Sequence, residues 1–192
     1  MLNTLLVIFW ALTYISIVFC SIKFRQERAF FMPLIAGALN FSWEIHALIT
    51  SGGYWGHIVW LALDCIILAY NIYCLSQPKK QLLYSSFVII CTGILYGIFS
   101  ITTMDGMLIS SFVIDIIMAV EYVLVIKHIS SRGRLLIGVL RLLGDMFAWL
   151  CNMHHSSAVL FIGILVLITN LFYCSYCLEL KSEKYFSKQR RK

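Results

Sequence analysis

Five of the nine acidic residues lie inside long apolar stretches, where an ionisable side chain is least expected. They are Glu44, Asp64, Asp115, Glu121 and Asp145. An ionisable group at the centre of a membrane helix costs about 2.5–3.5 kcal/mol on insertion scales. Such groups pair with one another or face a polar cavity, so each is a candidate functional residue.

Helical spacing gathers the polar side chains on shared faces, because residues three and four apart are neighbours on a helix. Three groups result: Gly37, Asn40 and Glu44; Gly138, Arg141 and Asp145; and His57, Trp60, Asp64 and Asn71. The glycines on two of these faces would let neighbouring helices approach closely.

Glu44 is the strongest candidate for chemistry. Its apolar run contains no basic residue, Trp43 flanks it, and Asn40 lies one turn away. An apolar pocket disfavours the charged form of a carboxyl. Such a group can therefore stay protonated near neutral pH and act as a general acid.

Structural roles compete with functional ones for the other ionisable residues. Arg141 and Asp145 lie one turn apart and can simply neutralise each other. A structural role is favoured for Asp115 and Glu121, whereas a structural and a functional role are equally favoured for Asp64.

The elements that must carry these residues are membrane-spanning helices. The 192 residues are 61% hydrophobic and 12% charged, against about 45–50% and about 25% in soluble domains, which excludes a soluble globular enzyme. Long apolar runs in lipid form helices, because every backbone polar group must be satisfied internally. The predicted class is an all-α polytopic bundle of seven transmembrane helices, over residues 2–20, 31–50, 54–75, 83–101, 106–126, 135–152 and 157–178.

The basic residues fall on one side of this predicted bundle. Fourteen of the fifteen lie in the first, third and fifth connections or in the C-terminal tail, and only Arg141 does not. The positive-inside rule then places the N-terminus outside and the C-terminus in the cytoplasm. We expect a transmembrane domain over residues 1–180 and a basic cytoplasmic tail over residues 181–192. The tail is interpreted as a topology signal and a contact for anionic membrane lipid rather than a nucleic-acid site.

A shift of 106 residues superimposes the first three predicted helices on the last three. Trp43 then meets Trp149, and Asp64 meets Asn170. The identities are few, but the spacing of the connections stays in step. A pseudo-repeat of three, one and three helices is therefore one interpretation, and transporters use such parallel repeats.

Short motifs carry a resemblance to a known family. Residues 39–45 read Leu-Asn-Phe-Ser-Trp-Glu-Ile, an N-x-x-W-E pattern. Trp60-Leu-Ala-Leu-Asp64 follows, and then Arg132-Gly-Arg and Arg141-Leu-Leu-Gly144. With seven helices in so short a chain, the sequence resembles the small integral-membrane terpene cyclases of meroterpenoid and indole-diterpenoid pathways, the PaxB-like family. The likeness extends over residues 35–178.

The resemblance implies acid-initiated cyclisation. In that family an intramembrane carboxylic acid protonates an epoxide or alkene of a prenylated substrate, and the resulting carbocation closes rings before it loses a proton. The family's acid in the second helix corresponds to Glu44, with Asn40 and Trp43 in its motif. The family's second acid lies in the last helix, where this chain has Asn170. Asp64 or Asp145 then substitutes for it, or one acid suffices, or cyclase activity is lost.

Two functions of different classes follow. The first is a membrane-embedded cyclase or related lyase, with Glu44, Asp64 and Asp145 as catalytic carboxyls and no cofactor or metal. Its substrate is a prenylated, lipid-soluble small molecule, made by an upstream prenyltransferase. The residues predicted to contact it are Asn40, Trp43, Trp60, Arg141, Trp149 and Asn170.

The second function is a small seven-helix transporter or lipid-binding protein, in which Asp64 and Asn170 are repeat partners at the midplane. The two functions predict different interiors. A cyclase needs a pocket closed to one side and lined by Trp and Phe, with Glu44 at its wall. A transporter needs polar residues along a route to both faces of the membrane.

Overall fold

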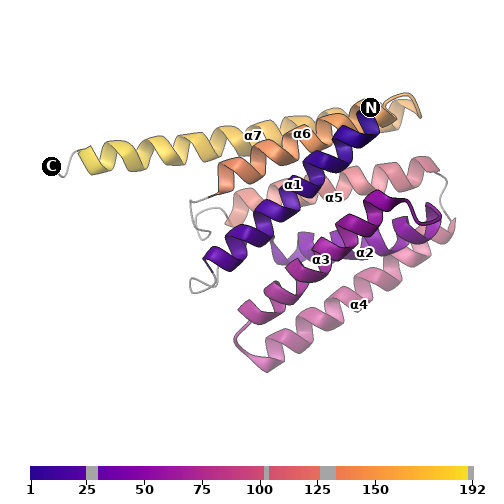
Figure 1. Cartoon of the computed structure of the whole chain (residues 1–192), viewed down its shortest axis with the longest axis horizontal. Coiled ribbons are helices and arrows are strands. Elements are labelled where there is room, and N and C mark those ends of the chain that lie inside the picture. The colour runs from indigo at the N-terminus through magenta and orange to yellow at the C-terminus, as the bar shows by residue number, and fades with distance from the viewer. Residues whose placement is uncertain (25–29, 102–103, 126–132, 190–192) are drawn as a thin grey trace.

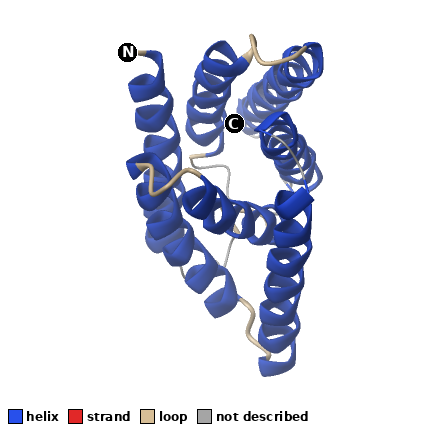
Figure 2. Cartoon of the chain, turned by 90° about the vertical axis from the view of Figure 1, so that its right-hand side faces the viewer, coloured by secondary structure: helices blue, strands red, loops and turns tan. Residues whose placement is uncertain are grey.

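The computed structural model of the chain is an all-helical bundle and describes residues 1–24, 30–101, 104–125 and 133–189, with the backbone alone for residues 125 and 181–189. Its helices are α1 (Leu2–Lys23), α2 (Leu34–Thr50), α3 (Trp55–Cys74), α4 (Pro78–Ile101), α5 (Met104–Val125), α6 (Arg134–Asn152) and α7 (Ser157–Gln189). The helices run back and forth, so the N- and C-termini lie at opposite ends (Figure 1). The described residues contain helices and loops without strands, which confirms the predicted fold class (Figure 2).

Six of these helices are long and apolar enough to cross a membrane. The exception is α2, whose 17 residues span about 25 Å at the α-helical rise per residue. This is the lower limit for a membrane span. Eight of its residues are buried, and it packs against α3, α4 and α5. α2 is therefore an enclosed helix of a multi-pass membrane bundle.

The predicted helix boundaries are wrong by three or more residues at four places. α1 continues to Lys23, past the predicted end at 20. α2 begins at Leu34 rather than at 31, because Pro33 restricts the backbone of the residue before it. α4 begins at Pro78 rather than at 83, because proline is favoured at the first helical position and the polar residues after it continue the helix. α7 continues to Gln189, past the predicted end at 178, because a helix needs no apolar side chains once it leaves the bundle.

The basic connections that were predicted to set the topology are described only in part. Lys23 ends α1, Lys79 and Lys80 lie in the first turn of α4, and Arg134 begins α6, all at the same end of the bundle. The other basic residues of the first and fifth connections lie in 25–29 and 126–132, outside the described residues. Residues 190–192 of the tail also lie outside them.

The helix packing follows the predicted repeat of three, one and three helices. α1 packs on α3 as α5 packs on α7, and α2 packs on α3 as α6 packs on α7. We call α1–α3 the first triplet and α5–α7 the second. The two triplets meet where α1 packs on α6 and α2 packs on α5, and these contacts are also equivalent under the repeat. α4 stands between the triplets in sequence and packs on α2 and α3.

Glycines allow two of these close helix approaches, as the sequence predicted. A Cβ atom on Gly138 would lie 2.6 Å from the Tyr173 ring of α7. A Cβ atom on Gly37 would lie 3.1 Å from the Asn71 amide nitrogen of α3. Both polar helix faces therefore pack directly on a neighbouring helix.

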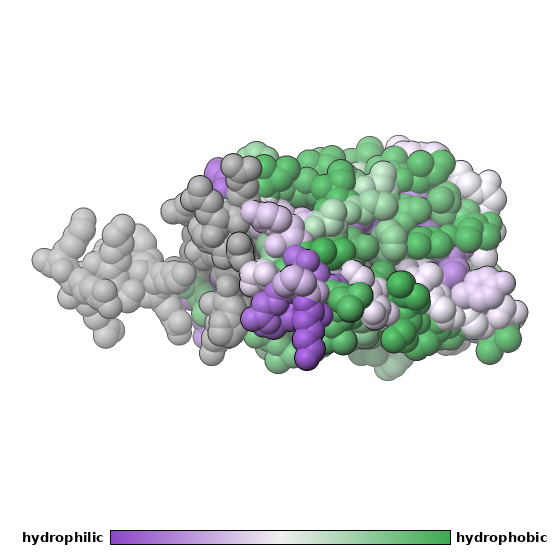
Figure 3. Space-filling view, turned by 90° about the horizontal axis from the view of Figure 1, so that it is seen from below, coloured by the Kyte–Doolittle hydropathy of each residue, from purple (hydrophilic) through white to green (hydrophobic). Residues whose placement is uncertain are grey.

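Apolar side chains cover much of the surface. Figure 3 shows one face that is mainly hydrophobic, with the hydrophilic colour gathered in one area. Leu82, Ile89 and Leu124 are 70%, 72% and 72% exposed. Such large exposed apolar area is expected where lipid covers the protein.

Candidate functional site

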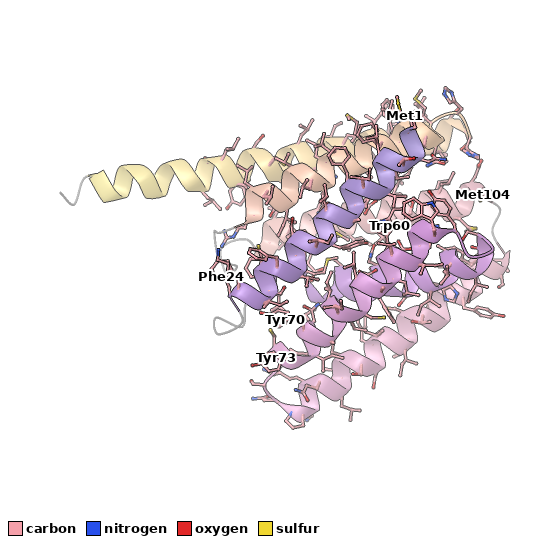
Figure 4. The ribbon with its side chains drawn as sticks, in the orientation of Figure 1. Met1, Phe24, Trp60, Tyr70, Tyr73 and Met104 are labelled. Atoms are coloured by element: carbon pink, nitrogen blue, oxygen red, sulfur yellow. The ribbon has the colours of Figure 1, made fainter. Side chains whose placement is uncertain are left out.

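A partly open cavity of about 330 Å³ lies at the end of the bundle that carries the N-terminus. Its wall includes Asn3 of α1, Tyr54 just before α3, Met104 at the start of α5 and Asn152 at the end of α6. Figure 4 shows Trp60, another wall residue, at this same end, near Met1 and Met104. The cavity thus lies away from the end that carries the basic residues of α1, α4 and α6.

Glu44 of α2 and His57 of α3 form a hydrogen-bonded pair on the cavity wall. Glu44 Oε2 lies 2.7 Å from His57 Nδ1, and the two side chains are 6% and 14% exposed. The turn between the helices contains Gly52 and Gly53 with φ of 66° and 87°, which glycine adopts without strain. This tight turn brings the carboxyl and the imidazole together, and a hydrogen-bonded pair of this kind is suited to proton transfer.

Three aromatic rings surround the His57 imidazole. The ring centroids of Trp60, Tyr54 and Trp43 lie 5.2, 5.6 and 5.7 Å from that of His57. The indole N–H of Trp43 donates to Ser110 Oγ of α5 at 3.1 Å, which fixes this ring. Burial raises the pKa of Tyr54, which precedes α3, above its ordinary value, so its hydroxyl stays neutral. The wall therefore offers aromatic faces that can stabilise a cation.

Asn40 connects the cavity wall to a buried carboxyl. Its Nδ2 donates to the Tyr14 hydroxyl of α1 at 2.5 Å and to Asp64 Oδ2 of α3 at 2.8 Å. Tyr14 and Asn40 line the cavity, whereas Asp64 is 2% exposed and lies behind the amide. Asp64 is therefore placed to position Asn40 rather than to touch a molecule in the cavity.

A second carboxyl on the wall, Asp115 of α5, belongs to a buried polar cluster. Asn170 Nδ2 of α7 donates to Asp145 Oδ2 of α6, and Asp145 Oδ1 has no hydrogen-bond partner among the described residues. Arg141 of α6 donates from Nη2 to the Asp115 carbonyl oxygen at 3.0 Å and lies 5.3 Å from the centre of the Tyr122 ring. Arg141 thus reaches α5 through a backbone carbonyl, and its Nε and Nη1 have no hydrogen-bond partner among the described residues.

Glu121 has a structural role, as predicted. Its carboxylate accepts hydrogen bonds from the backbone N–H groups of Ile35 and Ala36, at 3.2 and 2.8 Å. These are among the N–H groups at the start of a helix that lack a partner within it. Glu121 on α5 therefore holds the beginning of α2, the helix that carries Glu44.

Four of the predicted site residues line the cavity, namely Asn40, Trp43, Glu44 and Trp60. Five do not: Asp64, Arg141, Asp145, Trp149 and Asn170. Four of these five are buried and form hydrogen bonds in the two polar clusters, namely Asp64, Arg141, Asp145 and Asn170. Trp149 donates from its indole N–H to the Leu160 carbonyl at 3.2 Å and packs tightly on Gly163 of α7.

Sequence reasoning missed most polar residues of the wall, among them His57, Asp115 and Tyr14. His57 was placed on the correct face of its helix, but its pairing with Glu44 depends on how α2 and α3 are rotated. Asp115 was assigned a structural role, and Tyr14 carries no signal within an apolar run. Hydroxyl, imidazole and carboxyl groups at the wall are groups suited to proton transfer.

Within the described residues, no group of three or more His, Cys, Asp or Glu side chains is arranged to hold a metal ion. The chain matches no protein-family model, no curated protein and no solved structure. The resemblance to the PaxB-like cyclases therefore stays a prediction that depends on the sequence motifs.

Proposed function

We propose that the chain is a membrane-embedded, terpene cyclase-like enzyme that protonates a prenylated, lipid-soluble substrate and so starts a carbocationic cyclisation. The observation that supports this proposal is the position of Glu44, on the wall of a cavity rich in aromatic rings and in contact with His57. The cavity volume of about 330 Å³ falls in the range of small-molecule sites.

Glu44 is the general acid in this proposal. With the His57 Nδ1–H donating to Oε2, the other carboxyl oxygen carries the proton that goes to the substrate. The O–H bond of Glu44 breaks as a C–H bond forms at an alkene, or an O–H bond forms at an epoxide oxygen. The carboxylate that remains keeps the hydrogen bond from His57, which stabilises the charge that develops.

The aromatic rings of the cavity wall can stabilise the carbocation that forms when the substrate is protonated. Trp43 and Trp60 present electron-rich rings near the acid, and such rings attract positive charge. A largely apolar cavity also keeps water away from a reactive cation. Both features are needed if ring closure is to compete with capture of the cation by water.

The proposal accounts for Asn170, the amide at the position of the family's second acid, by a carboxyl on the neighbouring helix. Asn170 donates to Asp145, so a carboxyl lies on α6 directly beside the position where the family has one on α7. Arg141, one turn before Asp145 on α6, donates to the backbone carbonyl of Asp115, a residue that lines the cavity. The cluster therefore supplies the acidic function through α5 and α6.

A transporter is the second candidate, because the helices pack as two parallel triplets around a single linking helix. Transporters place substrate sites where such repeats meet. In that case the Asn40–Asp64 and Asn170–Asp145 bridges would play similar parts in the two halves, since each joins the second and third helix of its half. Uptake of a polar solute into proteoliposomes, lost on Asp64→Asn, would favour the transporter over the cyclase.

The distribution of basic residues gives the proposed orientation of the protein in the membrane. The end with Lys23, Lys79 and Lys80 faces the cytoplasm, as does the basic tail, and the cavity opens toward the other side. A prenyltransferase would supply the substrate, so a gene for one beside the gene for this chain would support the cyclase.

The direct test is Glu44→Gln, which keeps the size of the side chain and removes the acidic proton. The purified protein in lipid nanodiscs is given a farnesylated phenol with a terminal epoxide, and loss of substrate is followed by mass spectrometry. We expect turnover by the unchanged protein and a loss of at least 10²-fold in the variant, the usual contribution of a general acid. The matched control is Glu179→Gln on the exposed part of α7, which should keep full turnover. Equal turnover by the Glu44 and Glu179 variants would refute the assignment.

A further inference from the structure

Tyr14 of α1 and Asn40 of α2 lie at the deep end of the cavity. The cavity wall on α1 extends from Asn3 to Tyr14, about 16 Å at the α-helical rise per residue. Among the described residues, none after Tyr14 on α1 and none before Asn40 on α2 lines the cavity. The next turn of α1 contributes Ile17, which is 0% exposed and belongs to the apolar core. The cavity therefore ends at Tyr14 and Asn40.

The hydrogen bonds of these two residues leave one donor and one acceptor for a bound molecule. An asparagine amide has two N–H donors, and Asn40 uses both, because its Nδ2 donates to the Tyr14 hydroxyl and to Asp64 Oδ2. Asn40 Oδ1 accepts no hydrogen bond from the described residues. The Tyr14 hydroxyl accepts from Asn40 and donates to none of them, although Tyr14 is only 2% exposed. A hydroxyl donor and an amide oxygen acceptor are therefore available side by side.

Asp64 determines which way the Asn40 amide faces. Its Oδ2 accepts from the amide nitrogen at 2.8 Å, and Asp64 is itself buried. The amide oxygen is thereby turned away from Asp64. Asp64 is a positioning residue for this end of the cavity, and it acts through Asn40.

A hydroxyl group matches both available partners, because it accepts one hydrogen bond and donates another. An ether, an epoxide or a ketone cannot donate to Asn40 Oδ1, and an ammonium group cannot accept from Tyr14. No lysine or arginine of the described residues lines the cavity, whereas Glu44 and Asp115 do. An anionic group such as a phosphate would therefore be buried without a counter-charge, which is unfavourable. The deep end of the cavity thus favours a neutral hydroxyl group.

We propose that Tyr14 and Asn40 form a binding site for a hydroxyl group, and that the ligand is a neutral, lipid-soluble phenol or alcohol that enters the cavity hydroxyl end first. That this ligand is also the substrate rests on the proposed function. Asn40 and Glu44 lie one turn apart on α2, about 6 Å along the helix axis. An extended farnesyl chain is longer than this separation. A substrate with its hydroxyl group at Asn40 and its epoxide at Glu44 therefore has to fold, as ring closure requires.

The hydroxyl site is tested by ligand binding to the protein in lipid nanodiscs, with probes whose saturated chains cannot react. The probe is a hexahydrofarnesyl phenol, and it is compared with its methyl ether and with the hydrocarbon that lacks the oxygen. Binding is followed by tryptophan fluorescence, since Trp10, Trp43 and Trp60 line the cavity. We expect the phenol to bind at least about 10-fold more tightly than either analogue, because each analogue leaves a buried polar group without a partner. Equal dissociation constants for the phenol and the methyl ether would overturn the hydroxyl site.

Tyr14→Phe tests the donor. The variant keeps the ring, whose centroid lies 5.6 Å from that of Trp10, and removes only the hydroxyl group. The phenol should bind about 10-fold more weakly to this variant, whereas the affinity for the hydrocarbon should change by less than about 2-fold. Tyr96→Phe on the exposed side of α4 is the matched control and should bind all three probes normally. Unchanged binding of the phenol to Tyr14→Phe would contradict the assignment, and so would an equal loss for the phenol and the hydrocarbon.

Turnover separates the hydroxyl site from the proposed function. With the epoxidised farnesyl phenol, Tyr14→Phe should raise KM by a larger factor than it lowers kcat, because the contact is made in the ground state as well as in the transition state. If the unchanged protein prefers the phenol probe but does not consume the epoxide, the proposed function fails and the hydroxyl site stands. If it consumes the epoxide but binds the phenol and the methyl ether equally, the hydroxyl site fails and the cyclase stands.

Discussion

The bridge between Asn40 and Asp64 predicts that the two residues can be exchanged together but not singly. Asn40 Nδ2 donates to Asp64 Oδ2 at 2.8 Å, and both side chains are buried, at 7% and 2% exposure. The second triplet has the same kind of bridge with the residue types reversed, since Asn170 on its third helix donates to Asp145 on its second. The double substitution Asn40→Asp with Asp64→Asn reverses the residue types of the first bridge to those of the second, with the carboxyl one residue later on its helix than the repeat equivalent of Asp145.

The expected magnitudes follow from the partners that each change removes. Asp64→Asn replaces a carboxyl oxygen by an amide oxygen as the acceptor and should cost about 1 kcal/mol. Asn40→Asp removes the donor to two partners and sets two carboxyls against each other, which should cost about 3 kcal/mol. Independent effects would add to about 4 kcal/mol, whereas the double variant restores an amide–carboxylate bridge and should lose only about 1 kcal/mol.

Thermal unfolding in detergent micelles distinguishes these outcomes. For a chain of this size 1 kcal/mol corresponds to about 2–4 °C in Tm, so the double variant should lose about 2–4 °C and additive effects about 8–16 °C. Asp105→Asn at an exposed site serves as the control for the change of charge. A double variant that loses the sum of the two single losses would refute the bridge as the determining contact.

Two further substitutions test the packing that positions α2 and α6. Gly138→Ala puts a Cβ atom 2.6 Å from the Tyr173 ring and should cost about 1–3 kcal/mol. Gly93→Ala enters open space and should be neutral or stabilising, so equal Tm values for the two would contradict the close approach of α6 and α7. Glu121→Ala removes the acceptor at the start of α2 and should cost about 0.5–2 kcal/mol in thermal unfolding. Glu121→Gln keeps an acceptor oxygen and should cost less, and equal losses for the two Glu121 variants would count against this cap.

Much of the fold was predictable because a lipid environment restricts the choices. Each long apolar run has to form a helix, and the short connections between runs force neighbouring helices to be antiparallel. The repeat of three, one and three helices was one interpretation of the sequence, based on few identities, and the helix packing follows it. The start of α4 at Pro78 and the extension of α7 to Gln189 were not predictable from hydropathy, because polar residues neither require nor forbid a helix.

Sequence spacing predicted which site residues share a face of one helix, but not which residues of different helices meet. Asn40 and Glu44 share a face, and both reach the cavity. The pairing of Glu44 with His57 depends on the left-handed glycines of the α2–α3 turn and on the rotation of each helix, which no spacing within one helix reveals. Trp149 was predicted to contact substrate but does not line the cavity, because its ring packs on Gly163 of α7.

The two triplets differ at the positions that make the cavity. In the first, the ring of Trp43 lies beside His57, and Glu44 follows Trp43 in the sequence. The repeat places Gly163 at the position of His57 and Leu150 at the position of Glu44. Trp149 packs on Gly163 so closely that even a Cβ atom would not fit. In the second triplet the indole of Trp149 therefore occupies the space that holds the His57 imidazole and the Glu44 carboxyl in the first triplet. An acid at only one of the two equivalent positions favours the proposed cyclase, which needs one cavity, over a transporter. Alternating access uses both halves in the same way, so it gives no reason for the acid to be absent from one of them.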